Sequence, residues 1–191
     1  MLKLEYVVNS IFDSMTWSLS EMESNQVWLV DCGDAGSIKE KVVDKAIAGV
    51  LLTHAHFDHI YGLPELLKLY PDCRVYTNEV GRATLADSKQ NLSFFHESPL
   101  SVVGPQVLLC REGDEIELFP DVVARVYETP GHHPSCLTYK VCDYLFTGDA
   151  LIPGCKVVTN LPKGNKRIAQ ESFSRIKQLA LGKIICPGHQ L

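Results

Sequence analysis

Hydrophobic and polar positions in the first half of the chain fall into short blocks that predict strands alternating with helices. Apolar runs bounded by turn residues predict the strands, and positions with helical spacing follow them. Ser37 and Glu40 have the spacing of a capping box, which predicts where the first helix begins. In chain order the predicted elements are a strand at 26–30, a helix at 37–47, a strand at 50–52, a helix at 64–69, a strand at 74–77 and a helix at 79–89.

The second half is richer in strands. Several of its segments alternate apolar and polar residues with a period of two. The predicted elements are strands at 106–110, 115–119, 122–128, 137–141 and 144–146, a helix at 167–179 and a last strand at 183–186. Residues 88–104 have no clear periodicity. A stretch of this length in a compact domain is typical of a lid or a binding loop.

Length and composition indicate an ordinary globular protein. The 191 residues suffice for one domain, which we expect to span 1–191. Hydrophobic residues make up 46% of the chain and charged residues 21%. Lysine and arginine number 18 against 23 aspartates and glutamates, a net charge of −5. Nucleic-acid binding needs a concentrated positive field, so we expect no nucleic-acid partner.

The cysteines and the apolar runs indicate a cytoplasmic protein that does not enter a membrane. The longest apolar run, 46–52, is far shorter than a bilayer span, and the N-terminal residues lack the apolar core of a signal peptide. The seven cysteines are odd in number and form no Cys-x-x-Cys pair. We interpret them as small buried thiols in a reducing compartment.

The chemistry concentrates in the segment Thr-His-Ala-His-Phe-Asp-His at 53–59. His54 and His56 continue an extended segment, and a period of two sends both imidazoles to one face. Asp58 and His59 are neighbours on the following turn, so their side chains diverge. The segment can therefore supply two ligands to one cation and two to a second. Burying four such polar groups in a core would require a partner for each.

Three further motifs each follow an apolar strand directly. They are Thr-Pro-Gly-His ending at His132, Thr-Gly-Asp ending at Asp149 and Pro-Gly-His ending at His189. In layered α/β proteins the loops that form sites converge at the carboxyl ends of strands. A glycine before each polar residue lets the backbone turn sharply there. We expect all three side chains to meet the cluster at 53–59.

The donors suffice for two cations. One is predicted to be held by three histidines and the other by an aspartate and two histidines, with Asp149 bridging both: the sets are His54, His56 and His132, and Asp58, His59 and His189. Nitrogen and oxygen donors suit zinc, and also iron or manganese. A water shared by two dications has its pKa lowered from 15.7 towards roughly 7, which supplies hydroxide at neutral pH. The predicted reaction is hydrolysis of an acyl bond, with Asp58 and Asp149 as catalytic residues.

These four motifs, in this order, resemble those of the metallo-β-lactamase superfamily over residues 27–189. The resemblance implies an αββα four-layer sandwich, in which two mixed sheets pack face to face with helices on the outer faces. Asp31, in Asp-Cys-Gly, is similar to a family aspartate that lies below the site and orients the ligands.

Within the superfamily the chain is most similar to small single-domain proteins related to glyoxalase II, which residues 91–95 also resemble. Glyoxalase II continues into a helical domain that helps bind glutathione, whereas this sequence ends two residues after His189. We therefore expect a small ester, thioester or lactone in place of a glutathione thioester. Antibiotic hydrolysis is not expected either, because β-lactamases usually lack this combination of Asp-His with an aspartate at the position of Asp149.

Three more residues are candidates for the rim of the substrate site. His133 stands where the family commonly has a small hydroxyl residue, and His96 lies in the aperiodic stretch. Lys166, in a basic cluster at the start of the last helix, is placed to bind a substrate carboxylate. For His96 and Lys166 the competing interpretation is solvent exposure alone.

Two alternatives to a hydrolase follow from the same donors. A mononuclear iron oxidoreductase that resembles persulfide dioxygenases would use His54, His132 and Asp149, two histidines and a carboxylate with open positions for oxygen. A binding protein with a structural metal fits less well, because structural zinc sites are usually closed by four ligands, often thiolates. The sequence does not predict the oligomeric state.

Overall fold

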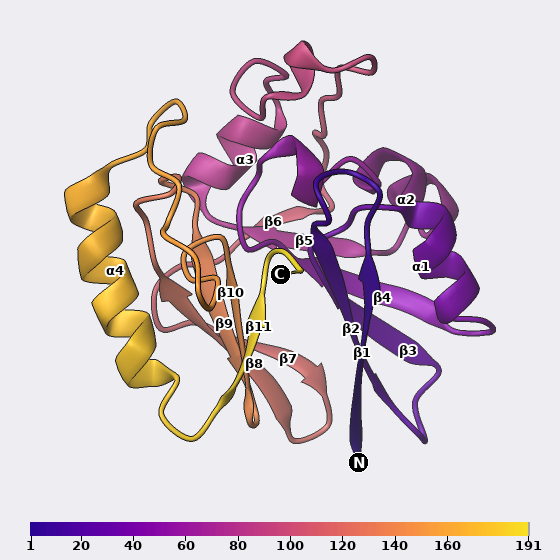
Figure 1. Ribbon diagram of the computed structural model, residues 1–191. Coiled ribbons are helices and arrows are strands. Elements are labelled where there is room, and N and C mark those ends of the chain that lie inside the picture. Colours follow the sequence, from indigo (N-terminus) through magenta and orange to yellow (C-terminus); the bar gives the residue numbers. More distant parts are fainter. Residues whose placement is uncertain (191) are drawn as a thin grey trace.

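The computed structural model describes residues 1–190, and its two β-sheets lie face to face with helices outside them (Figure 1). The first sheet has six strands, in the order β1 (Leu2–Val8), β2 (Met15–Glu21), β3 (Gln26–Val30), β4 (Ala46–Leu51), β5 (Arg74–Thr77) and β6 (Val107–Leu109). The second has five strands, in the order β11 (Ile184–Pro187), β10 (Tyr144–Gly148), β9 (Leu137–Val141), β8 (Val122–Glu128) and β7 (Glu115–Phe119). Each sheet mixes parallel and antiparallel pairs.

The helices complete the four layers. α1 (Ala35–Lys41) and α2 (Leu63–Leu69) cover the outer face of the first sheet, and α4 (Lys166–Leu179) covers the outer face of the second (Figure 1). α3 (Glu79–Leu85) lies at the upper edge in this view, with the 3-10 turns η1 (Phe57–His59) and η2 (Ser93–Phe95) in the nearby loops. The predicted αββα sandwich is confirmed. No described helix is long and apolar enough to span a membrane.

The sequence of β3 shows why the first sheet is buried on both faces. Val27 and Leu29 point into the cluster that also contains Ile38 of α1. Trp28 and Val30 point the other way, into the cluster between the two sheets. A central strand covered on both faces has no position for a polar side chain, so it is a continuous apolar run instead of an alternating one.

α4 is held to the second sheet by a narrow apolar face. Ala169, Ser172 and Ile176 are its buried residues, and Ile176 packs with Leu145 of β10. The side chain of Asn165 caps the helix by accepting hydrogen bonds from the backbone N–H groups of the second and third residues after it, both at 3.1 Å.

Several predicted boundaries were wrong. The helix predicted at 37–47 is α1, which begins at Ala35 and ends at Lys41, and the segment from Ala46 onward is β4. A left-handed residue, Asp44 (φ 62°), turns the chain between the two. The helix predicted to reach residue 89 ends at Leu85, because the Asp87 carboxylate accepts two backbone N–H groups in a tight turn.

The two N-terminal strands were missed. β1 and β2 form an antiparallel hairpin at one edge of the first sheet. In β1 the apolar Leu2 and Leu4, which alternate with Lys3 and Glu5, pack against the inner core. That period of two was the signal for an edge strand. The hairpin turn at 9–14 brings the chain to the edge of the sandwich where the candidate site lies, since Met15 N–H donates to the carbonyl of Gly188 at 2.7 Å.

Candidate metal centre

All seven predicted ligands meet at one edge of the sandwich, where loops from both sheets converge. The segment after β4 supplies His54 and His56, η1 supplies Asp58 and His59, and the loops after β8, β10 and β11 supply the rest: His132, Asp149 and His189. Three groups have potential ligand atoms within 4.8 Å of one another: His54, His56 and His132; His54, His59 and Asp149; and Asp58, His59 and His189. The first and last are the two predicted triads.

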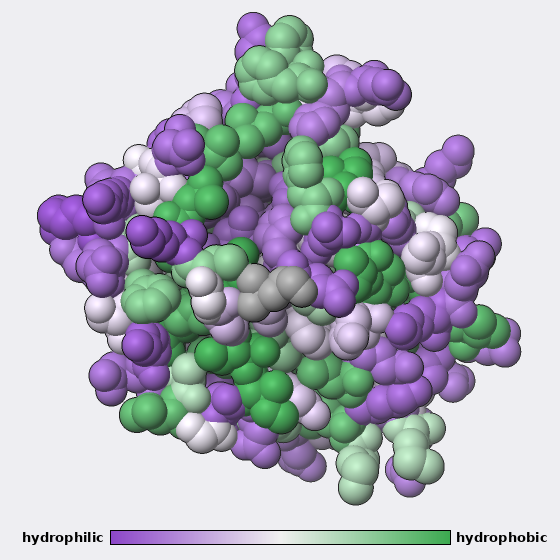
Figure 2. Space-filling view, in the orientation of Figure 1, coloured by the Kyte–Doolittle hydropathy of each residue, from purple (hydrophilic) through white to green (hydrophobic). Residues whose placement is uncertain are grey.

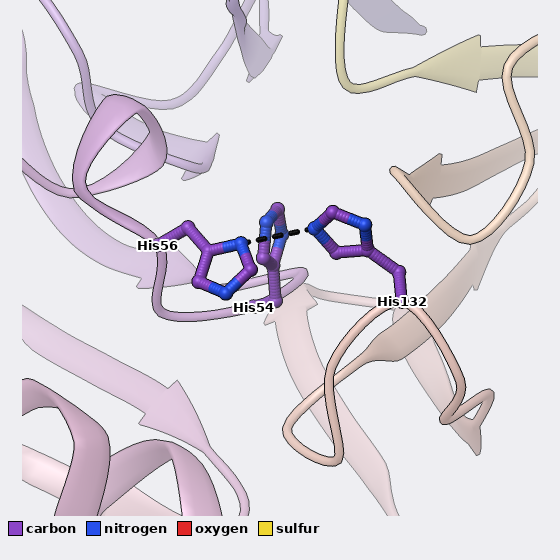
Figure 3. A group of neighbouring side chains, drawn as sticks. All are labelled: His54, His56 and His132. Atoms are coloured by element: carbon purple, nitrogen blue, oxygen red, sulfur yellow. Dashed lines mark hydrogen bonds between the residues drawn. The ribbon is translucent and has the colours of Figure 1, made fainter. Parts of the chain in front are cut away.

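The first triad is made of imidazoles that face one another (Figure 3). The Nδ1 of His56 lies 2.9 Å from the Nε2 of His132. The ring of His54 stands nearly perpendicular to both, with centroids 4.8 and 4.9 Å away. Burial is the main cause that lowers the pKa of His54 well below its ordinary value and that of His56 to about 3. These two rings are therefore neutral, the state in which imidazole binds a metal.

In two of the rings, a hydrogen bond to a backbone carbonyl group determines which nitrogen points into the centre. The Nδ1 of His132 donates to the carbonyl of Val158 at 2.8 Å, and the Nδ1 of His189 donates to the carbonyl of Phe12 at the same distance. A carbonyl oxygen can only accept, so the Nδ1 atoms carry protons and the Nε2 atoms are left for ligation. Phe12 and Val158 were missed, because a backbone carbonyl leaves no residue-specific signal in a sequence.

The second triad combines a carboxylate with two imidazoles. The Oδ2 of Asp58 lies 3.3 Å from the Nε2 of His59 and 3.2 Å from that of His189. Burial opposes charge on each of these groups, but attraction between the two imidazoles and the carboxylates around them, Asp149 included, is stronger. It raises the pKa of His59 well above its ordinary value and that of His189 to about 10, and it lowers the pKa of Asp58.

Asp149 lies between the triads. Its Oδ1 is 3.4 Å from the Nε2 atoms of both His59 and His189, and its Oδ2 is 3.6 Å from the Nε2 of His132. Burial raises the pKa of Asp149, but His59, His189 and His54 together hold it well below its ordinary value. The carboxylate is therefore ionised and presents one oxygen to each triad.

Asp31 lies beneath the cluster and contacts His59, one of the predicted ligands. Its Oδ2 accepts the Nδ1–H of His59 at 2.9 Å. The same carboxylate accepts the backbone N–H and the hydroxyl of Thr53, each at 2.7 Å. Thr53 was not assigned a role from the sequence, although its place at the head of the histidine motif was a signal. Its hydroxyl also lies 3.2 Å from the Nδ1 of His54.

The residues present fit a divalent cation at each triad. The Nε2 of His54 and the Oδ1 of Asp149 are buried and lack a hydrogen-bond partner within the described chain. Burying such atoms unsatisfied costs free energy, and bound cations would accept their lone pairs. The donors are imidazole nitrogens and carboxylate oxygens, which zinc, iron and manganese all accept.

The three predicted rim residues occupy different environments. His133 is buried, not at an open rim: its ring lies 4.9 Å from that of His56, and its Nδ1 accepts the backbone N–H of Ser135 at 3.2 Å. Burial, with the nearby charges of Lys163 and His132, lowers the pKa of His133 to about 4.

His96 is half-buried and stacks on Phe57. Lys166 is exposed at the first residue of α4.

The fold and the donors define a class of protein: an αββα sandwich with a cluster of histidine and aspartate side chains at one edge that could bind metal. Residues 22–189 match the family described as the metallo-beta-lactamase superfamily, and the chain belongs to that superfamily.

Curated relatives match most of this chain and are longer than it. The chain is 30% identical over 186 residues to the hydroxyacylglutathione hydrolases of Hamiltonella defensa subsp. Acyrthosiphon pisum and Erwinia tasmaniensis, matches that cover 88% and 96% of this chain. It spans 64% of the length of each of these relatives.

Solved structures show the same fold. BLEG-1 B3 metallo-beta-lactamase superimposes with a TM-score of 0.87 at 24% identity, over 99% of this chain and 92% of that one. TTHA1623 in a di-iron-bound form gives 0.81 at 22% identity, over 98% and 92% of the two chains. ETHE1 from Myxococcus xanthus gives 0.75 at 23% identity, over 99% and 76%.

Proposed function

We propose that this protein is a hydrolase that holds two divalent cations and cleaves a small acyl substrate, with thioesters as the first substrate class. The observation that carries the proposal is the position of Asp149, which presents Oδ1 to the second triad at 3.4 Å and Oδ2 to the first at 3.6 Å. A carboxylate placed in this way can bridge two cations. Curated relatives named for the hydrolysis of a glutathione thioester support the substrate class.

The neutral and the ionised side chains of the centre have different roles. Two cations in this centre would lower the pKa of water and polarise the acyl carbonyl. The neutral rings of His54 and His56 leave the positive charge of the first site uncompensated, which favours an anionic oxygen there. Asp58 and Asp149 are ionised, so Asp58 would stabilise a cation at the second site and Asp149 would stabilise cations at both sites. Asp31, Phe12 and Val158 hold the rings in their ligating orientation.

We place the enzyme in the cytoplasm, with zinc as the first metal to test and a small acyl compound as its partner. The cysteines support the compartment, because all seven are free thiols and five of them are buried. The net charge of −5 supports a reaction that involves no nucleic acid. No membrane partner is proposed.

The test is metal quantification followed by a substrate screen. Protein purified without added metal should carry about two metal ions per chain and should hydrolyse at least one of a hydroxyacylglutathione, an acyl thioester, an ester or a lactone. Asp149→Ala should lose metal and most of the activity. Asp143→Asn, which removes a surface carboxylate paired with Lys183, should change neither. Full activity in Asp149→Ala would disprove the proposal.

The alternative function is a mononuclear iron oxidoreductase. It is supported by the proximity of His54, His132 and Asp149, with the His132 Nε2 3.6 Å from the Asp149 Oδ2, and by a fold shared with ETHE1 from Myxococcus xanthus. Oxygen uptake with a persulfide substrate, dependent on one iron per chain, would favour it. Hydrolytic turnover by the zinc-loaded protein would exclude it as the main activity.

A further inference from the structure

A groove of about 730 Å³ is lined in part by Phe57 of η1, and none of the seven candidate ligands is among the residues that line it. Its walls come from three parts of the chain: the β1–β2 turn, the segment from η1 to α2, and the stretch after η2. Most of the side chains that line it are apolar or aromatic, among them Ile11, Phe57, Tyr61, His96 and Leu100. Figure 2 shows hydrophobic residues on both sides of the hydrophilic hollow at the centre of this face.

One wall of the groove is a stack of aromatic rings that adjoins the candidate metal ligands. The ring of His96 lies 4.3 Å from that of Phe57 at an interplanar angle of 29°, and the ring of Phe12 meets its edge at 5.9 Å. Phe57 precedes Asp58 in the chain, and the carbonyl of Phe12 holds His189. The wall is therefore connected to the second triad through Phe57 at the start of η1 and through the backbone of Phe12.

Hydrogen bonds fix the shape of the groove. The hydroxyl of Tyr61 donates to the Oδ1 of Asp34 at 2.6 Å. The backbone N–H and the hydroxyl of Ser10 donate to the same carboxylate, each at 2.8 Å. These bonds tie the turn that carries Ile11 to the segment that carries Phe57. The groove is therefore formed before a ligand arrives, which reduces the entropic cost of binding.

The charges around the groove select against anions. Glu65 and Glu97 are exposed on its border, and the described residues that line it include neither lysine nor arginine. A carboxylate bound here would lie near two like charges without a partner. An uncharged chain would bury apolar surface against the aromatic wall.

We propose that this groove binds an uncharged apolar arm of the substrate, and that His96 is a residue that determines specificity by forming its wall. The inference rests on the proposed hydrolase function and names its substrate class: thioesters with an apolar acyl chain are preferred over those whose chain ends in a carboxylate.

The kinetic test uses thioesters of one uncharged thiol, N-acetylcysteamine, with acetyl, butanoyl, hexanoyl and succinyl groups. In the wild-type protein kcat/KM should rise about fourfold for each added methylene, and the succinyl thioester should be poorer than the butanoyl one. In His96→Ala the ratio of kcat/KM for the hexanoyl thioester to that for the acetyl thioester should fall at least tenfold. Phe94→Ala removes an exposed ring from the same segment but outside the groove, and it should retain the dependence. Glu97→Lys should improve the succinyl substrate.

A binding measurement separates this inference from the proposed function. The S-hexyl and S-methyl thioethers of N-acetylcysteamine cannot be hydrolysed, and their affinities are measured by isothermal titration calorimetry on the metal-loaded protein. Tighter binding of the hexyl compound by at least tenfold, lost in His96→Ala and kept in Phe94→Ala, upholds the groove assignment even if no thioester is turned over. Equal affinities for the two thioethers, or equal losses in the two variants, overturn it. A preference for the succinyl thioester over the butanoyl one also overturns it.

Discussion

The Nδ1 of His59 lies 2.9 Å from the Oδ2 of Asp31, while the Nε2 of the same ring lies within 3.4 Å of both Asp58 and Asp149. One imidazole thus connects a buried carboxylate below the site to two carboxylates within it. The orientation of this ring decides whether its Nε2 can reach a cation at the second triad. Asp31 should therefore matter to metal binding although it is not itself a ligand.

Asp31→Asn is expected to weaken metal binding about 10- to 100-fold, the usual effect of removing a group that orients a ligand. An asparagine amide has only one accepting oxygen, so it cannot accept from both the backbone N–H of Thr53, which bonds Oδ1, and the Nδ1–H of His59, which bonds Oδ2. Competition with a chelator of known affinity measures the change. Asp143→Asn is the matched control on the surface, and unchanged affinity in Asp31→Asn would contradict the role given to this carboxylate.

Removing one ligand from each triad should distinguish the two sites. His189→Ala should bind one cation of the expected two, because the imidazoles of the first triad remain. His56→Ala should weaken the first site and leave Asp58, His59 and His189 in place. Metal analysis after gel filtration counts the ions per chain in each variant. If both variants retained two ions, the assignment of ligands to triads would be wrong.

Gly188 precedes a ligand at a position with no room for a side chain. A Cβ there would lie 2.3 Å from the Oδ1 of Asp149 and 3.0 Å from the Cε1 of His59. Gly188→Ala is therefore expected to displace the bridging carboxylate and to abolish binding of the second metal. Gly36→Ala is the control, because a Cβ there meets nothing within 4 Å and alanine is the better helix former. Thermal unfolding and metal content, measured together on both variants, test the prediction.

The ion pair between Glu112 and Arg175 should make the free energy of unfolding depend on pH. The Arg175 guanidinium, hydrogen-bonded to Glu112 at 2.6 and 3.0 Å, is the main cause that lowers the pKa of this carboxyl below its ordinary value of 4.5. Because the folded pKa is the lower one, the contribution to stability is present above pH 4.5 and is lost as the pH falls through the folded pKa.

Urea unfolding of wild type and Glu112→Gln at pH 7 and at pH 3 tests this pair. The difference in unfolding free energy between the two proteins should shrink at pH 3, where the wild-type carboxyl is becoming protonated. Glu117→Gln, which alters an exposed glutamate of β7, should show no such change. If the difference in unfolding free energy between wild type and Glu112→Gln were the same at both pH values, the ion pair would not be a source of pH dependence.

Much of the site was predictable because its ligands follow strands. His132, Asp149 and His189 each stand after a glycine at the carboxyl end of an apolar run, and the sheets bring those ends to one edge. The strands at 26–30, 74–77 and 122–128 were also predicted with their observed bounds. Local patterns sufficed in these cases, because the burial of each strand is reflected in its own apolar run or in its alternation of apolar and polar residues.

Other features depend on contacts that the sequence does not display. The helix predicted to run to residue 47 stops at Lys41, because pairing of β4 with β3 takes the residues from Ala46 onward. His133 lies buried beside His56 instead of at the rim, since the backbone of Ser135 holds its ring inward. Such outcomes are decided by tertiary packing, which overrides local propensity.

The two sheets are built from consecutive parts of the chain, β1–β6 from its first 109 residues and β7–β11 from Glu115 onward. Four of the seven ligand residues, His54 to His59, belong to the first part, and the other three to the second. A chain cut in the connection at 110–114 should therefore give two fragments, each with an incomplete set of donors. Divalent metal should strengthen the reassociation of the two fragments. A metal ion bound for catalysis would then also hold the two parts of the chain together.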